Sequence, residues 1–98
     1  MFYQLTDADK QAIASGEAIL LDVRRADEYQ AGHPKHAKNF NVELIDAGQL
    51  PEIAKDTPIF TYCRRGVRAE RAEQALTGAG FSNVKNIGGL DDVIKEVQ

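Results

Sequence analysis

The chain contains 98 residues, of which 43% are hydrophobic and 28% are charged, and its formal net charge is −3. This length predicts one domain over residues 1–98, and the composition is typical of a globular protein and argues against disorder. The single cysteine excludes an internal disulfide, the aliphatic runs are too short to cross a membrane, and the net acidity disfavours nucleic acid as a partner. The N-terminus lacks the basic and apolar regions of a signal peptide. We therefore expect a cytoplasmic protein, or a periplasmic one if a leader has been removed.

The first half of the chain alternates between helix-like and strand-like segments. Thr6 stands three residues before Asp9, which is the spacing of a capping box, and it predicts a short helix from about Asp7 to Ser15 that ends at Gly16. A continuous apolar run at 18–23 is typical of a strand buried on both faces of a parallel sheet. Residues 2–5 are a candidate for an additional strand.

The next segments continue this alternation. Residues 26–32 predict a short helix that ends near Gly32, and 37–42 predict a brief strand. Asn41 can cap a helix that follows it, and Pro51 can open another helical turn.

The second half repeats the pattern. Residues 58–62 predict a strand, and the apolar positions after it recur with helical spacing at Ala72, Ala75, Leu76 and Ala79. Residues 83–87 predict a strand, Gly88-Gly89 a turn, and 90–98 a final helix. Strands that alternate with helices predict an α/β fold with a parallel sheet.

The cysteine lies where this pattern places a ligand site. Cys63 follows a strand and precedes a helix, and ligands of open parallel sheets bind at the carboxyl ends of the strands. Three arginines follow it: Arg64, Arg65 and Arg68. Gly66 permits a positive φ or a close approach to an anion, and the helix that begins near Val67 offers unpaired N–H groups. These features favour a reactive thiol beside an anion site, although a lone cysteine can also be a small buried hydrophobe.

The chain contains three motifs, YCRRGVRA, LLDVRRADEYQAGH and NIGGLDD, which together resemble the rhodanese family of sulfurtransferases. The sequence YCRRGVRA resembles the family's active-site loop, in which a cysteine is followed by four residues and an arginine. Upstream, LLDVRRADEYQAGH is similar to the family's Asp-Val-Arg, Glu-Tyr and Gly-His pattern, and downstream NIGGLDD is similar to its Gly-Gly-Leu segment. The resemblance implies a three-layer α/β/α sandwich on a five-stranded parallel sheet with strand order 3-2-4-5-1.

The resemblance also implies roles for individual residues. Cys63 would be the catalytic nucleophile and would carry sulfur as a persulfide between thiosulfate, or a similar small anionic donor, and an external thiol or cyanide acceptor, with no cofactor. The substrate would be bound by the loop residues Arg64, Arg65, Gly66, Val67 and Arg68. The charged residues upstream, Asp22, Arg24 and Glu28, would be structural and would pair with one another.

Two other functions stay open at this point. Related phosphatases of this fold have a loop one residue longer and a histidine before the cysteine, whereas Tyr62 stands there in this chain. A non-catalytic or carrier module that receives persulfide from a protein donor is the second alternative.

The histidines and their surroundings complete the sequence evidence. His33 and His36 are three residues apart, but Pro34 between them disfavours a helix, so no metal site is expected. The family usually continues Gly-His with Ile-Pro-Gly-Ala, whereas this chain has Pro34, Lys35 and His36 before Ala37. The chain also lacks the tryptophan that often follows the Gly-Gly-Leu segment.

Overall fold

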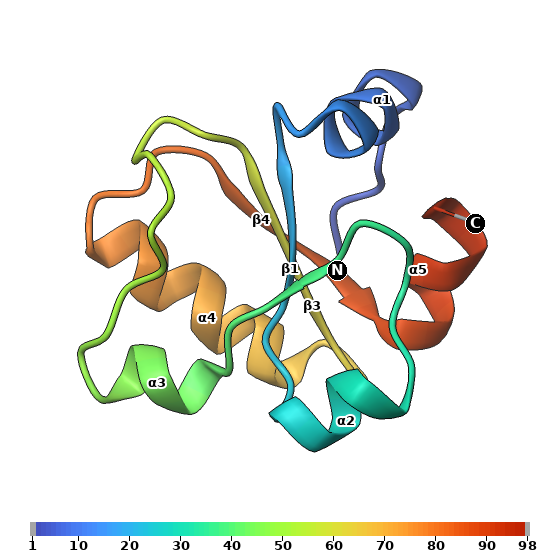
Figure 1. Cartoon of the computed structure of the whole chain (residues 1–98). Helices are drawn as coiled ribbons and strands as arrows, with labels where there is room; N and C mark the ends of the chain where they lie inside the picture. The colour runs from blue at the N-terminus through green and yellow to red at the C-terminus, as the bar shows by residue number, and fades with distance from the viewer. Residues whose placement is uncertain (1, 98) are drawn as a thin grey trace.

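A computed structural model describes residues 2–97, and its centre is a parallel sheet (Figure 1). The strands are β1 (Ile19–Asp22), β2 (Lys38–Asn39), β3 (Ile59–Cys63) and β4 (Val84–Gly89). Their order in the sheet is β2-β1-β3-β4, and every neighbouring pair is parallel. The predicted α/β fold is therefore confirmed.

Helices cover both faces of the sheet (Figure 1). They are α1 (Asp7–Ser15), α2 (Ala26–Ala31), α3 (Val42–Asp46), α4 (Val67–Gly78) and α5 (Leu90–Val97). One buried cluster joins the sheet to α3 and α4, and the other joins it to α1 and α5. Successive side chains of a strand point to opposite faces, so Cys63 belongs to the first cluster and Tyr62 to the second. This arrangement is a three-layer sandwich.

Several helix ends follow local signals that the sequence already contains. Thr6 and Asp9 form the predicted capping box, and the helix ends at Gly16, whose φ is 89°. Asn41 caps α3 by accepting a hydrogen bond from the backbone N–H of Glu43 at 3.0 Å. These predictions depend on contacts within one helical turn, which explains why they are confirmed.

The described part of the sheet has four strands rather than the expected five. Residues 2–5 do not form a strand; the backbone N–H of Tyr3 donates one hydrogen bond to the carbonyl oxygen of Asn86 in β4, at 2.9 Å. The segment therefore lies beside the β4 edge without a ladder. The observed order corresponds to the expected 3-2-4-5-1 without its last member.

Two other predictions are wrong. Pro51 opens no helical turn; residues 47–58 are turns and irregular chain. Gly88 and Gly89 do not form a separate turn but extend β4, since Gly89 pairs with Cys63 of β3 after a shift in register. A strand extended in this way brings two glycines beside the cysteine loop.

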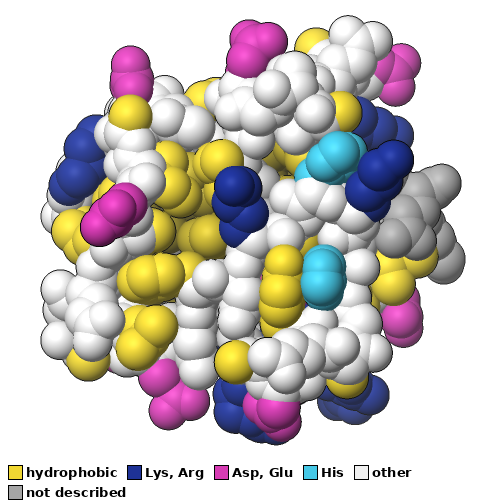
Figure 2. All heavy atoms as spheres, viewed as in Figure 1, with side chains coloured by type: hydrophobic (Ala, Val, Ile, Leu, Met, Phe, Trp, Pro, Cys, Tyr) yellow, Lys and Arg dark blue, Asp and Glu magenta, His cyan; other side chains and the backbone are white. Residues whose placement is uncertain are grey.

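The surface carries interspersed charges of both signs, with hydrophobic side chains gathered at the left of the view in Figure 2. Leu44 and Leu50 are among the exposed apolar residues. Within residues 2–97, we find no helix with the length and hydropathy needed to span a membrane.

Candidate active site

The thiol of Cys63 lies at the carboxyl end of β3, inside the turn that leads to α4. The residue is only 1% exposed. The backbone N–H of Gly66 donates a hydrogen bond to its Sγ atom, with a nitrogen–sulfur distance of 2.9 Å. Gly66 has a φ of 99°, a left-handed conformation that favours glycine because a side chain would be strained there. The turn thus folds the chain back so that an N–H group points at the sulfur.

The beginning of α4, which directly follows Gly66, carries further N–H donors. Gly66 is the N-cap residue, and no side chain caps the helix. The first N–H groups of any α-helix have no partner within the helix, and together with the helix dipole they favour a bound anion. The end of β3 and the start of α4 therefore form a site for negative charge around the thiol.

Two of the three arginines of this loop are exposed to solvent. Arg64 and Arg65 are both exposed, and neither takes part in an ion pair within the described residues. Val67 is 72% exposed, so it contributes apolar surface beside the loop. The two cations are free to meet an incoming anion.

The third arginine, Arg68, is expected to bind the substrate, but in the structure it is paired with a carboxylate. Arg68 donates to both carboxylate oxygens of Glu28 in α2, at 2.7 and 3.1 Å. This carboxylate is the main cause of the raised pKa of Arg68, and the Cys63 sulfur contributes as well. The same pair lowers the pKa of Glu28 to about 2, with a smaller contribution from the Arg25 backbone N–H. Arg68 therefore lies within reach of both the carboxylate and the thiol.

The predicted pairing among the three upstream charges is only half correct. Arg24 and Asp22 form a buried ion pair in which the guanidinium contacts both carboxylate oxygens at 2.7–3.0 Å. Glu28 does not join them, since its partner is Arg68 on a distant element. The sequence separation of 40 residues explains the error, because local reading pairs charges that are near in sequence.

The buried pair anchors the segment that carries Glu28. The Tyr62 hydroxyl donates to Asp22 at 2.5 Å, and burial is the main cause of the raised pKa of Tyr62. Arg24 also donates a hydrogen bond of 2.7 Å to the carbonyl oxygen of Gly32, and Gly32 is the C-cap residue of α2. Both ends of α2 are thus fixed relative to the sheet, and Glu28 is held facing the cysteine loop.

Sequence reasoning missed Asn86, which braces the loop from β4. Its side-chain nitrogen donates to the carbonyl oxygen of Gly66 at 3.0 Å, and its side-chain oxygen accepts from the N–H of Gly88 at 2.9 Å. The residue is 8% exposed. Asn86 is two residues from the buried Val84 and so lies on the same face of the strand, and a polar side chain at such a position is the signal that could have revealed it.

The two glycines of β4 let the loop approach the sheet closely. A Cβ atom on Gly89 would lie 2.6 Å from the carbonyl oxygen of Arg64, and one on Gly88 would lie 2.8 Å from the ring of Phe2. The Phe2 ring also packs against Gly66, where an added Cβ atom would lie 2.5 Å from it. The Gly-Gly pair is therefore needed for space as well as for conformation.

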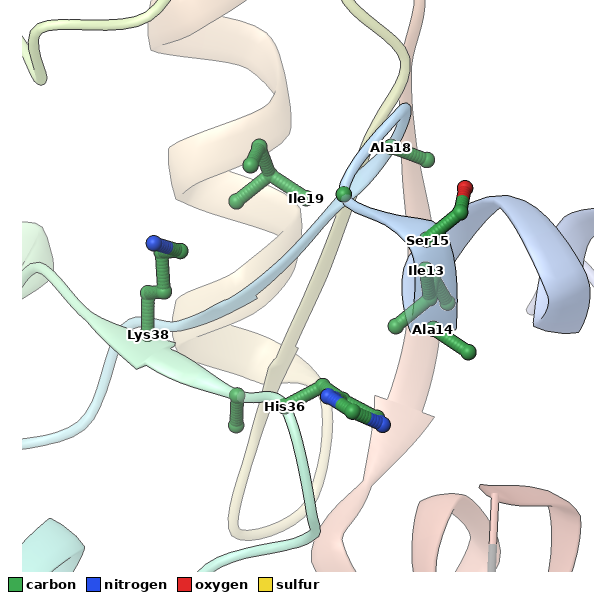
Figure 3. Close-up of a pocket in the computed structure, with 9 residues that line it drawn as sticks. Ile13, Ala14, Ser15, Ala18, Ile19, His36 and Lys38 are labelled. Carbon is green, nitrogen blue, oxygen red and sulfur yellow. The ribbon is translucent and has the colours of Figure 1, made fainter.

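A groove of about 560 Å³ opens beside the loop, between α2 and α5. Its lining includes Glu28 and His33 on one side, Leu90 and Ile94 on the other, and Arg64 at the loop. A second groove, of about 410 Å³, lies away from the loop between the end of α1 and the start of β2, and Figure 3 shows His36 and Lys38 lining it. Among residues 2–97, no group of three or more histidine, cysteine or acidic residues is placed to hold a metal ion.

Comparison with known proteins agrees with this geometry. A family model, the rhodanese-like domain, matches residues 6–96. The chain belongs to the rhodanese-like domain family. The match spans all three motifs that suggested the family, including the loop from Cys63 to Arg68.

Individual relatives of this rhodanese-like domain differ in length. The chain is 34% identical over 73 residues to the uncharacterized protein YqhL of Bacillus subtilis, covering 74% of this chain and 57% of that protein. It is 33% identical over 84 residues to the tRNA uridine(34) hydroxylase of Onion yellows phytoplasma, covering 81% of this chain and 27% of that protein. The chain thus spans about half or less of the length of these relatives.

Among solved structures, the rhodanese-like fold is shared with the human single-domain sulfurtransferase TSTD1. The two structures superpose with a TM-score of 0.76 at 22% identity, covering 89% of each chain. At this identity the similarity shows the fold alone. His36 has a φ of 72°, a left-handed conformation that favours glycine, and it stands where the family pattern usually has a glycine.

Proposed function

We propose that the protein is a sulfurtransferase that moves sulfane sulfur through a persulfide on Cys63. The observation that carries this proposal is the Cys63 sulfur held in a six-residue loop, with the Gly66 N–H at 2.9 Å from it and the uncapped start of α4 beside it. Membership of the rhodanese-like family supports it. We propose thiosulfate, or a similar small anion, as the donor.

The donor half-reaction requires a thiolate and a leaving group. The Cys63 thiolate attacks the outer sulfur of thiosulfate, the sulfur–sulfur bond of the donor breaks, and sulfite leaves with the bonding electron pair. The product is a Cys63 persulfide anion whose terminal sulfur takes the place of the attacking thiolate in the loop. The Gly66 N–H and the first N–H groups of α4 stabilise negative charge at that position.

The rim of the loop attracts and orients the donor. Arg64 and Arg65 are exposed and unpaired within the described chain, so they can bind the sulfonate end of thiosulfate. Arg68 is held by Glu28 and acts on the sulfur from a fixed position. Glu28, Asp22 and Arg24 support the loop without touching the donor.

The acceptor half-reaction returns the thiolate. An external thiolate or cyanide attacks the terminal sulfur of the persulfide, the bond to the Cys63 sulfur breaks, and the electron pair returns to Cys63. Two separate half-reactions predict ping-pong kinetics. No second cysteine exists in the chain, so the acceptor comes from outside it.

Loop size disfavours phosphate as the substrate. The loop from Cys63 to Arg68 has four residues between the two, and the Gly66 N–H already lies 2.9 Å from the sulfur. A phosphoryl group on the thiol would bring three oxygens into this space, whereas a persulfide adds one atom. The loop therefore favours sulfur transfer over phosphate hydrolysis.

The test is the mass of the intact protein after incubation with thiosulfate. We expect the wild type to gain one sulfur atom and to release sulfite, and Cys63→Ser to gain none. Aryl phosphate hydrolysis is measured on the same samples. An unchanged mass together with rapid phosphate hydrolysis would refute the proposal, and sulfur uptake only from a protein persulfide would identify a carrier module instead.

A further inference from the structure

We propose that His33 is the base that takes the proton from the acceptor thiol in the groove beside the cysteine loop. The inference rests on the proposed sulfur transfer and adds to it the residue that activates a protonated thiol acceptor. The loop arginines are not bases, and the carboxylates of Asp22 and Glu28 are already paired with arginines. Histidine is the side chain that most often fills this role near neutral pH.

The ring of His33 is held in one orientation although the residue is exposed. It stacks on the ring of Tyr29, with the ring centroids 3.7 Å apart and the planes within 5° of each other. Its Nδ1 atom lies 2.8 Å from the backbone carbonyl oxygen of Tyr29. Tyr29 is fixed in turn, because its hydroxyl donates to the carbonyl oxygen of Ala37 at 2.6 Å.

This contact decides which ring nitrogen can accept a proton. A carbonyl oxygen can only accept a hydrogen bond, so Nδ1 of His33 carries the hydrogen. In the neutral ring Nε2 is then the unprotonated nitrogen with a free lone pair. The backbone of α2 thus sets the tautomer that a general base requires.

The groove brings this ring and the cysteine loop to one cavity. His33 and Arg64 line the same groove of about 560 Å³, a volume within the usual range for small-molecule sites. Arg64 directly follows Cys63, and its carbonyl oxygen accepts from the N–H of Leu90, which lines the opposite wall. A small molecule in the groove therefore contacts both the His33 imidazole and the residue that directly follows Cys63.

The walls suit a thiol with an apolar stem. Ala31, Leu90 and Ile94 contribute apolar surface, and Arg64 offers a positive charge for a thiolate or a carboxylate. The carboxylate of Glu28, which also lines the groove, is already paired with Arg68 and does not repel a thiolate as a free charge would.

The proposed step balances in atoms and charge. His33 Nε2 takes the proton of the thiol, and the resulting thiolate attacks the terminal sulfur of the Cys63 persulfide. The bond between that sulfur and the Cys63 sulfur breaks, which regenerates the Cys63 thiolate and forms the acceptor persulfide. The proton then leaves His33 to solvent.

The expected gain follows from how little an alkyl thiol ionises. Only a small fraction is thiolate near pH 7, so a base that takes the proton as the thiol attacks accelerates the reaction by about tenfold or more. An aryl thiol is already ionised near neutral pH and has little to gain from a base. The two acceptors therefore distinguish proton transfer from a general loss of structure.

The experiment measures single-turnover discharge of persulfide-loaded protein by β-mercaptoethanol and by thiophenol. His33→Asn keeps a side-chain N–H for the Tyr29 carbonyl oxygen but has no base. His36→Asn is the matched control, because His36 lines the other groove (Figure 3) and asparagine tolerates its positive φ. Figure 2 shows histidine side chains open at the surface, as such a comparison needs.

We expect His33→Asn to slow discharge by β-mercaptoethanol by about tenfold or more and discharge by thiophenol by less than about twofold. His36→Asn should match the wild type with both acceptors. Added imidazole should restore a large part of the rate of His33→Ala with β-mercaptoethanol, which a purely structural role would not produce.

Three results separate this inference from the proposed function. If the wild type does not acquire sulfur from any donor, the sulfur transfer itself is wrong. If it acquires sulfur and His33→Asn discharges as fast as the wild type, only the role of His33 is overturned. Equal slowing with both thiols, or no response to imidazole, also overturns that role.

Discussion

Arg68 in α4 and Glu28 in α2, which are 40 residues apart in sequence, form a bidentate ion pair. The two guanidinium nitrogens lie 2.7 and 3.1 Å from the two carboxylate oxygens. The carboxylate side chain is 15% exposed and the guanidinium 27%. The pair engages Arg68 and leaves Arg64 and Arg65 as the exposed cations of the loop. It therefore divides the three arginines into one fixed group and two available ones.

This pair predicts how stability depends on pH. The pKa of Glu28 is lowered from 4.5 to about 2 in the folded protein, mainly by Arg68. A lowered pKa stabilises the folded state above the unfolded value of 4.5, and the contribution disappears as the pH falls toward 2. We expect Glu28→Gln to reduce the free energy of unfolding by about 1–2 kcal/mol near neutral pH, which is less than the full shift would give because solvent screens the pair.

Urea unfolding over a pH series checks this expectation. The difference between the wild type and Glu28→Gln should shrink as the pH is lowered and vanish near the folded pKa. Asp27→Asn is the matched control, since Asp27 is 73% exposed and its ion-pair partner within residues 2–97 is the exposed Arg25. A difference that persists unchanged in acid would show that the Glu28 charge is not its source.

Gly66 provides a test of backbone strain in the loop. Gly66→Ala places a Cβ atom 2.5 Å from the Phe2 ring and in a left-handed conformation. We expect a loss of stability of at least about 1–2 kcal/mol and slower persulfide formation, because left-handed backbone alone costs this much. Thermal and urea unfolding measure the first effect, and sulfite release measures the second.

A double variant separates the two causes. Phe2→Ala removes the clash but not the positive φ, so Phe2→Ala with Gly66→Ala should still be less stable than Phe2→Ala alone. Gly78→Ala, in α4 with nothing within 4 Å of its Cβ, should instead gain up to about 1 kcal/mol. If the double variant were as stable as Phe2→Ala alone, the left-handed backbone at Gly66 would have no measurable cost.

Tyr62→Phe tests the buried cluster behind the site. The change removes the hydroxyl that donates to Asp22 at 2.5 Å, while Arg24 keeps its own contacts with that carboxylate. We expect a loss of about 1–3 kcal/mol, because the lost hydrogen bond was made to a charged acceptor. Persulfide formation should change little, since Tyr62 and Cys63 point to opposite faces of the sheet. A large loss of sulfur uptake with normal stability would refute this view.

His36→Gly tests the backbone strain at His36, which has a positive φ and stands where the family pattern usually has a glycine. At a φ of 72°, glycine avoids the strain that a side chain meets, although it loses more entropy on folding. We expect a net gain in the free energy of unfolding of about 0.5–1 kcal/mol. Lys35→Gly, next to it without a positive φ, should lose stability instead. If both variants lose stability equally, the conformation of His36 carries no strain.

The sequence alone was sufficient where neighbours in the chain decide the structure. The helix from Asp7 to Ser15 is bounded by the Thr6 capping box and by Gly16, as predicted. The continuous apolar segment before Asp22 forms the buried strand β1. The position of Cys63 between a strand and a helix, and the family itself, also followed from residues that are close in sequence.

The tertiary structure decided the features that depend on distant contacts. The partner of Glu28, the bracing by Asn86 and the extension of β4 through Gly89 all join segments far apart in the chain. The number of strands in the described sheet also depends on whether the segment with Tyr3 can form a ladder beside β4, and residues 2–5 form no strand there although Tyr3 donates a backbone hydrogen bond to Asn86. Local signals such as caps and apolar periodicity act within one or two turns of chain, whereas long-range ion pairs such as Glu28–Arg68 and the register of the sheet form only when packing brings separate elements together.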